Sequence, residues 1–470
     1  MIYDVLVAGT GVIGAMIARE LTRYDLSVCM VEKENDVACG ASKANSGIIH
    51  GGYDPEPGTL KAKLNTLGVD KLYATAEALH VPFKRNGSLV CAFSAEEDAT
   101  VKALYERGQI NGIPQLKVLT GEEARALEPE LSGAVTSALH VPTAGIICPY
   151  DLTIAAAGNA MDNGAELVRN FEITSIDYAE GLFTLTAADG RTLQGKRLFN
   201  CAGTGSDKLA KLAGDDFFTI IPRAGEYMLL DKTEGSRVRH TIFQVPTKEG
   251  KGILVSPTVD GNLLTGPTAA VCDSRETTPE GLQTVGKLSA KSVPGVNFRS
   301  VITSFTGVRA SEKNGDFIIE KSKNNENLIH VAAVDSPGLT ACVAIAEYAV
   351  GLLGEMKENP NFCGDREDPH AFRHMTDEEK DAYIKAHPDY GKIVCRCETV
   401  SEGEIRSAIR RNPPALDLDG VKRRTRSGMG RCQGGFCGPY VMQLLAEENG
   451  VPKETITKNG GDSYMVTGKL

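Results

Sequence analysis

Four cysteines near the end of the chain have a spacing that suits metal chemistry. Cys395 and Cys397 flank a single arginine, and Cys432 and Cys437 follow after a gap of 34 residues. A bond between the first two would be strained, because near neighbours seldom reach disulfide geometry. Four thiolates are the ligand set of a structural zinc ion or of a [2Fe–2S] cluster. Zinc sites more often use C-x₂-C pairs, with two residues between the cysteines, so the C-x-C spacing favours the cluster, with zinc and redox disulfides as the alternatives.

A second group of residues, near the start of the chain, suits phosphate binding. Gly9, Gly11 and Gly14 form the pattern G-x-G-x-x-G between an apolar run at 2–8 and a helical pattern. The first glycine permits a tight turn, the second lets the backbone approach a pyrophosphate, and the third lets helix and strand pack closely. Glu32 ends the next strand, where a carboxylate accepts the ribose hydroxyls of an adenosine. The sequence therefore predicts a dinucleotide site.

Alternating strands and helices must position these residues. Hydrophobic periodicity predicts strands at 2–8, 27–32, 87–93, 138–141, 165–173, 182–187, 197–201, 226–231, 252–256, 261–265, 316–320 and 328–334, and helices at 12–24, 59–80, 96–109, 121–127, 150–163 and 340–354. This mixture indicates an α/β fold with two interleaved subdomains. One is a doubly wound, Rossmann-like nucleotide fold, and the other is an α+β substrate lobe with an antiparallel sheet.

The chain changes composition after the helix at 340–354. The stretch 357–392 is polar and contains three prolines, and Thr376 with Glu379 predicts a capped helix near 376–386. Residues 391–470 carry 13 Lys/Arg against 9 Asp/Glu, although the whole chain has a net charge of −10. We therefore expect a small separate domain. The predicted division is 1–355 for the two subdomains, 356–390 for a linker, 391–455 for the small domain and 456–470 for a tail.

Composition limits the classes of protein that fit. A net charge of −10 argues against nucleic-acid binding. The start of the chain reads as a strand and not as a secretion signal, and no run of 18 apolar residues is present to span a membrane. The other eight of the 12 cysteines are scattered singly, as reduced, buried thiols would be. We expect a cytoplasmic protein, with peripheral contact at the inner face of a membrane left open.

The stretch ACGASKANSGIIHGGYDPEPGTLKAK, residues 38–63, decides between nucleotide cofactors. It resembles the FAD-dependent oxidoreductases of the D-amino-acid oxidase and glycine oxidase superfamily. Within them it is most similar to the L-2-hydroxyglutarate dehydrogenases, whose pattern NSG-[IV]-IH-x-G … PGSLKA is present as NSGIIHGGYDPEPGTLKA. The similarity continues at GIICPYDLT, NCAGTGSD, RAGEY, GVRAS and DSPGLTACVAIAEY, over nearly all of 1–355.

This resemblance implies a set of FAD-binding residues. It places the cofactor on Gly9, Gly11, Gly14, Glu32, Lys33, Ser42, Asn45, Ser46, Ala202, Gly203, Ser336, Gly338, Leu339 and Thr340. The segment from Ser336 to Thr340 is expected to close over the isoalloxazine, because SPGLT before an apolar helix forms a nest of backbone N–H groups. The implied fold is a FAD-binding Rossmann-like domain interleaved with an α+β substrate lobe, followed by a small helical [2Fe–2S] domain.

The resemblance also suggests which side chains meet the substrate. Oxidation of a secondary alcohol needs a base for the hydroxyl proton, and the family motif puts His50 beside the flavin. A packing role or a covalent bond to the flavin are the alternatives for His50. Arg309 in TGVRAS occupies the family's substrate-anion position, the alternative being an inter-strand salt bridge. Tyr227 and Arg223 are further candidates, and Lys61 either faces the site or is solvated.

One departure from a related family concerns phosphate binding. Glycerol-3-phosphate dehydrogenases of the same superfamily often have HGG-x-RY after the corresponding histidine, with the arginine helping to hold phosphate. This chain has HGGYDP instead. A phosphate would have to be bound by other residues.

The C-terminal segment resembles a known cluster domain. Residues 393–446 are similar to the bacterioferritin-associated-ferredoxin-like [2Fe–2S] domain, which implies cluster ligation by the four cysteines of the C-terminal pairs. Glycine N–H groups and a basic run would stabilise the cluster and raise its potential. The alternative for the run is a solvated surface or a docking patch for an acidic partner. The run consists of Lys422, Arg423, Arg424, Arg426 and Arg431.

The combination of both domains is similar to the large subunit of anaerobic glycerol-3-phosphate dehydrogenase. It implies an enzyme that oxidises a small anionic secondary alcohol and sends electrons to a flavoprotein or iron–sulfur partner, or to a quinone. The leading substrate is sn-glycerol 3-phosphate, with L-2-hydroxyglutarate as the close alternative. An amino or imino acid dehydrogenase and a non-catalytic electron-transfer subunit are further alternatives.

Overall fold

The strand before the glycine motif lies inside a mostly parallel sheet. The computed structural model describes residues 1–246, 252–466 and 468, so positions 467, 469 and 470 of the predicted tail lie outside the described residues. β1 (Ile2–Ala8) pairs in parallel with β2 (Val28–Val31) and with β12 (Thr192–Asn200). The last four residues of β1 are all buried, as the apolar run of a strand covered on both faces requires.

Helices cover this sheet and complete the nucleotide lobe. α1 (Val12–Leu21) follows the glycine turn and packs against α5 (Pro149–Asp162) and α8 (Gly338–Gly351). The remaining elements of the lobe are β9 (Glu166–Val168), β10 (Ile173–Ala179), β11 (Leu182–Ala187), β19 (Ile318–Lys321), β20 (Leu328–Ala332), α2 (Leu60–Ala78) and α6 (Ser206–Leu212). β9 and β20 extend the parallel part, and β10, β11 and β19 add antiparallel edges.

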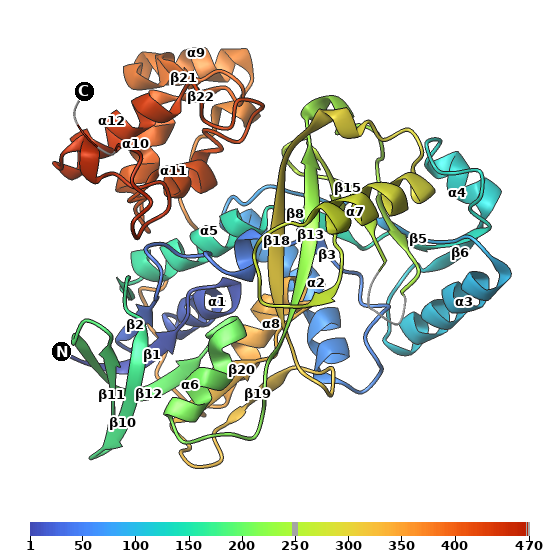
Figure 1. Ribbon diagram of the computed structural model, residues 1–470. Helices are drawn as coiled ribbons and strands as arrows, with labels where there is room; N and C mark the ends of the chain where they lie inside the picture. Colours follow the sequence, from blue (N-terminus) through green and yellow to red (C-terminus); the bar gives the residue numbers. More distant parts are fainter. Residues whose placement is uncertain (247–251, 467, 469–470) are drawn as a thin grey trace.

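A second, mostly antiparallel sheet forms the substrate lobe. Its two longest strands, β13 (Ile221–Leu230) and β18 (Val301–Ser311), pair along nearly their whole length and stand side by side in the middle of Figure 1. Their register places Arg223 opposite Arg309 and Tyr227 opposite Phe305. The other strands are β5 (Ser88–Ala92), β6 (Lys117–Thr120), β7 (Ser137–Val141), β14 (Thr241–Gln244), β15 (Leu254–Pro257), β16 (Leu263–Gly266) and β17 (Ala270–Val271).

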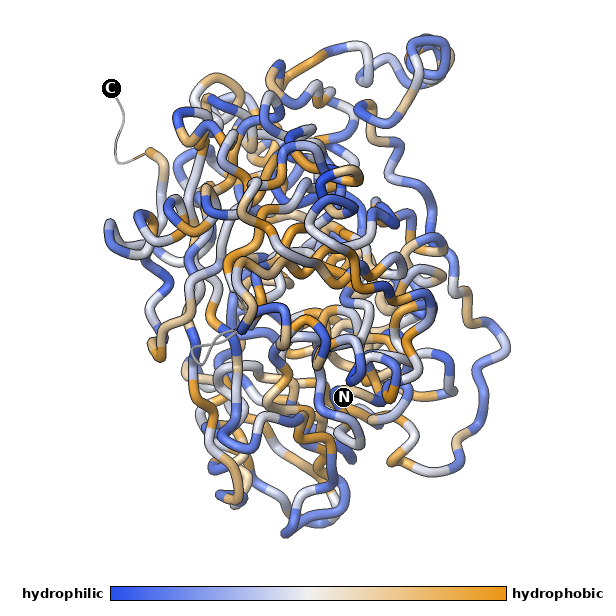
Figure 2. The backbone as a smooth tube through the Cα atoms, turned by 90° about the vertical axis from the view of Figure 1, so that its right-hand side faces the viewer, coloured by the Kyte–Doolittle hydropathy of each residue, from blue (hydrophilic) through white to orange (hydrophobic). Residues whose placement is uncertain are grey.

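Three helices and a small sheet complete the large domain. The helices are α3 (Ala95–Ile110), α4 (Gly121–Leu127) and α7 (Pro279–Ser292). The small sheet has the order β3 (Ile48–Ile49), β8 (Gly145–Ile147) and β4 (Phe83–Lys84). Short 3₁₀ turns lie at Ala41–Lys43, Gly203–Gly205, Lys232–Glu234 and Phe298–Ser300. Hydrophobic residues gather along the inner segments of the chain and the outer loops are mostly hydrophilic (Figure 2).

The C-terminal region folds into a small helical domain with its own core, at the upper left of Figure 1. A two-stranded ribbon, β21 (Ile393–Cys395) and β22 (Val400–Ser401), precedes α10 (Glu402–Arg410), α11 (Leu418–Thr425) and α12 (Gly438–Asn449). Short 3₁₀ turns lie at Pro388–Gly391 and Lys453–Thr455. A reciprocal capping box of Ser401 and Glu404 starts α10.

The segment predicted as a linker, 356–390, packs against both domains. It contains the 3₁₀ turn Phe372–His374 and α9 (Asp377–Ala386), which begins at the expected capping box of Thr376 and Glu379. Arg366 bonds to Asp162 of the large domain, with Nε 3.0 Å from Oδ2, and also donates to the carbonyl of Asn412. The segment therefore connects the two domains through specific contacts.

Two further points concern the scattered cysteines and the membrane. Six of the eight are buried as predicted, but Cys272 and Cys363 are exposed. The prediction is wrong for these two because both lie in loops, one after β17 and one after α8. Among the described residues, no helix is both long enough and apolar enough to cross a bilayer.

Candidate flavin site and iron–sulfur site

A cavity of about 490 Å³ lies between the nucleotide lobe and the substrate lobe. The glycine turn and the end of β2 line it on one side, and β13 and β18 line it on the other. The predicted residues on its wall are Gly9, Gly11, Glu32, Lys33, Ser42, Asn45, Ser46, His50, Ala202, Gly203, Tyr227, Arg309, Ser336, Gly338 and Leu339. The fold thus brings together side chains from one end of the large domain to the other.

The glycine turn fits a bound pyrophosphate. Gly9 has a φ of +97°, and a Cβ there would lie 2.5 Å from the carbonyl oxygen of Cys201. A Cβ on Gly14 would lie 1.9 Å from the carbonyl oxygen of Gly9. Gly14 does not line the cavity, because its role is the close packing of α1 on β1 that the motif predicts. The N-terminus of α1 is left facing the cavity, as an anion site requires.

Side chains from the following loops hold the walls in place. Ser42 accepts a hydrogen bond from the backbone N–H of Val12 at 2.8 Å, at the start of α1. Asn45 accepts from the N–H of Gly47 at 2.8 Å. Glu32 accepts from the N–H and the hydroxyl of Thr10, at 2.9 and 2.6 Å. Burial raises the pKa of Glu32 although these bonds oppose the rise. On the cavity wall, the Glu32 carboxylate can accept hydrogen bonds from the ribose hydroxyls of a bound adenosine.

The segment after β20 has two roles. Ser336, Gly338 and Leu339 line the cavity, whereas Thr340 is fully buried behind it and does not. The Thr340 hydroxyl accepts from the backbone N–H of His50 at 2.9 Å. Of the segment expected to close over the cofactor, only the residues before Thr340 line the cavity. Thr340 instead holds the backbone of His50, the candidate base.

His50 follows the short strand β3 and faces the cavity. Its Nε2 lies 3.2 Å from the hydroxyl of Ser336, and its ring centroid lies 6.0 Å from that of Phe243. Asn65 donates to the His50 carbonyl at 3.3 Å. Asn65 thus holds the backbone of His50, while Ser336 and Phe243 hold its imidazole at the cavity wall.

Tyr227 and Arg309 come from the paired strands β13 and β18. The Tyr227 hydroxyl lies 3.1 Å from that of Ser46, and its ring stacks on Phe305 with centroids 4.9 Å apart. Burial raises the pKa of Tyr227, so this hydroxyl stays protonated near neutral pH. Arg309 donates to the carbonyl of Thr268 at 3.0 Å. Among the described residues no carboxylate forms an ion pair with Arg309, so the inter-strand salt bridge is not found.

Arg275 also lines the cavity, and no motif in the sequence pointed to it. It is exposed and lies in the loop between β17 and α7. Lys61 does not point freely to solvent, because its Nζ lies 2.5 Å from Asp335, a residue of the cavity wall. Arg223 is not part of the wall. Sequence alone did not identify Arg275 as a site residue, because its loop reaches the cavity only through the pairing of the flanking strand β17 with β13.

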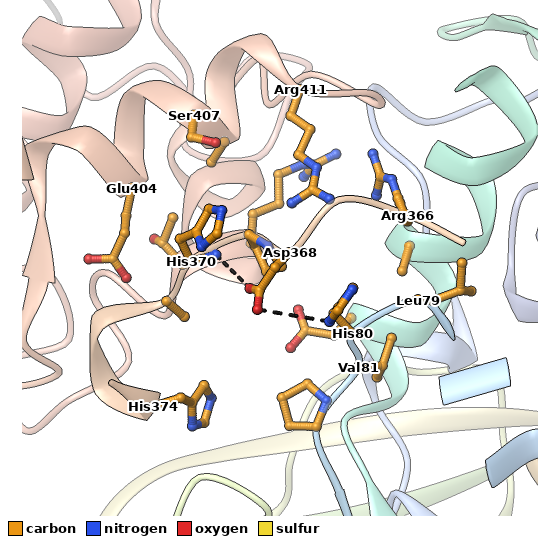
Figure 3. Close-up of a pocket in the computed structure, with 18 of the residues that line it drawn as sticks. Leu79, His80, Val81, Arg366, Asp368, His370, His374, Glu404, Ser407 and Arg411 are labelled. Carbon is orange, nitrogen blue, oxygen red and sulfur yellow. Dashed lines mark hydrogen bonds and ion pairs between the residues drawn. The ribbon is translucent and has the colours of Figure 1, made fainter. Parts of the chain in front are cut away.

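A larger cavity, of about 980 Å³, lies between the two domains and the segment that joins them (Figure 3). In it Asp368 accepts from the backbone N–H of His370 at 2.7 Å and lies 3.8 Å from Nδ1 of His80. None of the predicted site residues lines it. Its wall has no glycine-rich turn, so it does not suit a dinucleotide.

The four C-terminal cysteines lie at the end of the small domain as two pairs. The Sγ atoms of Cys397 and Cys432 are 3.9 Å apart, and Cys395 forms a side-chain hydrogen bond with Cys437. In the part of the chain that the structure describes, no three His, Cys, Asp or Glu side chains converge as around a single metal ion. Two neighbouring pairs of sulfurs suit a two-iron cluster, which is ligated by two thiolates at each iron.

Backbone groups around these sulfurs also fit a cluster. Glycine N–H groups lie beside two of them, because Gly428 donates its N–H to Cys395 and Gly434 donates to Cys432. A Cβ on Gly430 would lie 2.2 Å from the Cβ of Cys397, so only glycine is accommodated. Donors of this kind stabilise the charge of a thiolate-bound cluster.

A continuous line of contacts runs from the first cavity to the cysteine loops. Gly47 lines the cavity, and its carbonyl accepts from the N–H of Ile147 at 2.8 Å. Three residues further on, the hydroxyl of Tyr150 lies 3.5 Å from Sδ of Met429. Met429 precedes Gly430, which touches Cys397. The two sites are thus joined by packed protein.

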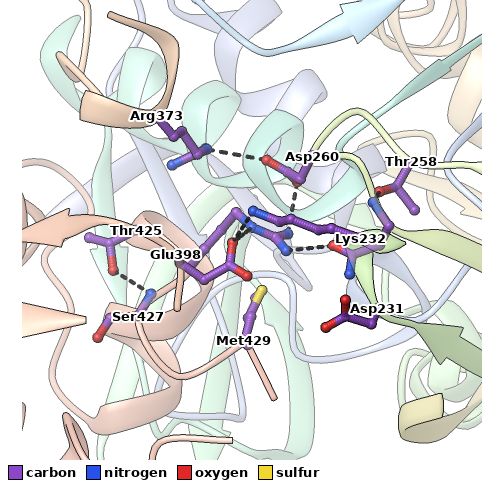
Figure 4. A network of polar contacts seen from close by, with 12 residues as sticks. Asp231, Lys232, Thr258, Asp260, Arg373, Glu398, Thr425, Ser427 and Met429 are labelled. Carbon is purple, nitrogen blue, oxygen red and sulfur yellow. Dashed lines mark hydrogen bonds and ion pairs between the residues drawn. The ribbon is translucent and has the colours of Figure 1, made fainter. Parts of the chain in front are cut away.

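Charged side chains fix the two domains together. Asp36 of the large domain is buried between Arg423 and Arg424, with closest O–N distances of 2.6 and 2.7 Å. Burial alone would raise the pKa of Asp36, but the two guanidinium groups outweigh it and hold the pKa well below its usual range. In the second contact Arg426 bonds to Glu398, Asp260 and Asn262. Figure 4 shows the polar network around Glu398 and Asp260.

The basic run is therefore not the exposed docking patch considered from the sequence. Arg423, Arg424 and Arg426 are buried against carboxylates of this chain, and Arg431 pairs with Asp231 of the large domain at 2.7 Å. That interpretation is wrong because the partners of the run are far away in sequence. The run joins the two domains of one chain.

The fold and the two sites define a flavin-type oxidoreductase joined to a cluster-binding domain. Residues 4–352 match the family of FAD dependent oxidoreductases, and residues 393–447 match the BFD-like [2Fe-2S] binding domain. The chain belongs to this FAD-dependent oxidoreductase family. It binds FAD in its large domain and a [2Fe–2S] cluster in its small domain.

Known proteins resemble the chain to different extents. It is 44% identical to a glycerol 3-phosphate dehydrogenase of Caloramator mitchellensis over 99% of this chain and 98% of that protein. A FAD-bound L-alpha-glycerophosphate oxidase structure from Mycoplasma pneumoniae is 34% identical, with a TM-score of 0.75, over 78% of this chain and 98% of that one. The mitochondrial L-2-hydroxyglutarate dehydrogenase of Homo sapiens is 30% identical over 58% of this chain and 62% of its own length.

Proposed function

We propose that this protein oxidises sn-glycerol 3-phosphate to dihydroxyacetone phosphate and delivers the electrons, through its cluster domain, to an acceptor protein or quinone. The observation that carries the proposal is the 44% identity to a glycerol 3-phosphate dehydrogenase over both domains. Similarity to the L-2-hydroxyglutarate dehydrogenase covers 58% of this chain. The whole-chain match outweighs the short N-terminal motif shared with the latter family.

The cavity provides the cations that a phosphate ester needs. Arg309 has unused guanidinium donors and no carboxylate partner among the described residues. Arg275 lines the same cavity from the opposite loop. A guanidinium without an anionic partner in a partly buried site favours a bound anion. We assign the phosphate to these two arginines, which replace the arginine that is missing from HGGYDP.

His50 is the candidate base. When bound, FAD supplies the acceptor for the hydride of the alcohol carbon. His50 takes the hydroxyl proton, and Ser336 at 3.2 Å orients the imidazole. Tyr227, held by Ser46, donates a hydrogen bond to the substrate oxygen. Thr340 keeps the His50 backbone in place.

L-2-hydroxyglutarate remains the second candidate, because the arginine that helps to hold phosphate in relatives is absent from HGGYDP. Anaerobic titration of the purified enzyme separates the candidates, with bleaching of the flavin absorbance as the signal. We expect bleaching by glycerol 3-phosphate and none by L-2-hydroxyglutarate or proline. Bleaching by L-2-hydroxyglutarate alone would replace the proposed substrate, and bleaching by none would favour a non-catalytic electron-transfer subunit. We infer a cytoplasmic protein and leave peripheral contact with the inner face of a membrane open.

A further inference from the structure

The cluster site has one closed edge and one open edge. Cys395 and Cys437 are 2% and 3% exposed and belong to the core of the small domain. Cys397 is exposed and Cys432 is half-buried. Electron transfer between proteins weakens steeply with distance, so a partner must approach the open edge.

An aromatic ring stands at this open edge. Phe436 is 89% exposed, although its backbone N–H donates a hydrogen bond to the sulfur of Cys432. Covering a phenylalanine side chain is worth about 1.5–3 kcal/mol. Aromatic residues are enriched at protein interfaces, where their rings fill the desolvated centre. The position of Phe436, one residue from Cys437, puts such a contact directly beside the redox centre.

An arginine that forms no ion pair among the described residues lies at this edge. It is Arg396, which is exposed between Cys395 and Cys397, whereas Arg431 beside Cys432 is paired with Asp231 of the large domain at 2.7 Å. The loops 392–399 and 428–439, described throughout, contain a single carboxylate, that of Glu398. It is buried and bonded to Arg426 and Lys232. No exposed acidic side chain of these loops therefore offsets Arg396.

We propose that this cluster rim, formed by Arg396, Cys397, Cys432 and Phe436, is the docking surface for a small acidic one-electron carrier protein. The proposal rests on the proposed function, because it names the acceptor of the same electrons. Oxidation of the alcohol to the ketone releases two electrons and two protons. The cluster carries one electron at a time, so two carrier molecules are each reduced by one electron per product, and the protons go to solvent. Opposite charges on rim and carrier speed their encounter.

The test uses the complete enzyme with glycerol 3-phosphate and two oxidised carriers of opposite charge, acidic plastocyanin and basic cytochrome c. At low salt we expect faster reduction of plastocyanin, with a rate that falls as salt is added. Arg396→Glu should slow plastocyanin reduction about tenfold and weaken its salt dependence. Phe436→Ala should slow it several-fold at all salt concentrations. Reduction of a small dye by both variants should stay within about twofold of wild type, because the dye needs no docking surface.

Lys102→Glu is the matched control, because Lys102 is exposed on α3, far from the small domain in Figure 1. It makes the same change of charge and should leave plastocyanin reduction unchanged. Iron content and the visible spectrum confirm that each variant keeps its cluster. Equal plastocyanin rates in wild type and both rim variants would overturn the docking surface. Preferential reduction of cytochrome c, or of a quinone in vesicles without any carrier, would overturn the class of partner. Flavin bleaching by the substrate would still stand in those cases, so the proposed function is tested separately.

Discussion

Arg426 of the small domain donates a hydrogen bond to Asp260 of the large domain, with Nη1 2.8 Å from Oδ2. The same guanidinium donates through Nε to Glu398 at 2.8 Å. Glu398 follows Cys397 directly, and Asp260 lies in the turn between β15 and β16 of the substrate lobe. One buried side chain thus ties a cluster loop to the domain that holds the flavin. This contact is one of those that set the position of one redox centre relative to the other.

Replacing Arg426 tests that dependence. Arg426→Gln leaves Glu398 and Asp260 buried without their main cation, which costs about 3 kcal/mol, since Lys232 and Arg373 still contact them. We expect flavin reduction by substrate within twofold of wild type and cluster reduction slowed at least tenfold. Anaerobic stopped-flow absorbance follows both. Lys357→Gln breaks an exposed pair with Asp25 and should change neither rate. Equal slowing of both steps would contradict a role confined to domain docking.

The glycine turn gives a prediction about cofactor binding. Gly9→Ala puts a Cβ 2.5 Å from a backbone oxygen at a φ of +97°, so the turn must move. We expect the variant to be purified without FAD, while the cluster domain keeps its iron. Gly40 also lines the cavity but has no atom within 4 Å of its Cβ position, so Gly40→Ala should bind FAD normally. The flavin released on heating measures the FAD content of both variants. Full FAD occupancy in Gly9→Ala would disprove the role of Gly9 in the cofactor turn.

Replacing the two arginines of the cavity should slow oxidation of a substrate that carries a phosphate and have little effect on a neutral substrate. Arg309→Ala removes a guanidinium that we assign to the phosphate, which should lower kcat/KM for glycerol 3-phosphate by about 10²-fold or more. The much slower oxidation of glycerol should be nearly unchanged. Arg275→Ala should give a smaller loss of about tenfold, because its side chain is exposed. Steady-state kinetics with both substrates checks this, and equal losses with glycerol would mean that Arg309 supports the fold instead.

Replacing His50 should change the rate of flavin reduction and not the affinity for the substrate. His50→Asn should lower the rate of flavin reduction by about 10²–10⁴-fold with little change in substrate affinity, as expected for loss of a general base. Ser336→Ala removes only the partner at 3.2 Å and should cost about tenfold or less. Single-turnover bleaching gives both numbers. A normal bleaching rate in His50→Asn would exclude His50 as the base and would mean that the histidine only packs at the cavity wall.

Local sequence signals predicted the elements well. The glycine motif, the burial of β1 and the capping box of Thr376 and Glu379 all depend on neighbours in the chain, and the structure contains each of them. The four cysteines were recognisable because two close pairs occur in a short basic segment.

Contacts between distant segments were not predictable. The helix α7 and the strand β18 were missed, and with them the loop that brings Arg275 to the cavity. Asp36 and its partners Arg423 and Arg424 are separated by 387 and 388 residues, so no local pattern links them. A basic run looks the same in sequence whether its partner is solvent, another protein or a buried carboxylate of its own chain.

The first strand gives a prediction about acid stability. Asp4 bonds to Lys196 and Ser27, at 2.7 and 2.8 Å. Burial alone would raise the pKa of Asp4, but these bonds outweigh it and lower the pKa to about 2. A carboxylate whose pKa is lower in the folded state adds stability above its unfolded pKa of about 3.9, and this stability is lost as the pH falls toward 2. After solvent screening we expect about 1 kcal/mol. Asp4→Asn should therefore unfold at lower urea concentration than wild type at pH 6, and the difference should shrink at pH 3. A difference that stays constant between these pH values would show that the charge of Asp4 contributes nothing.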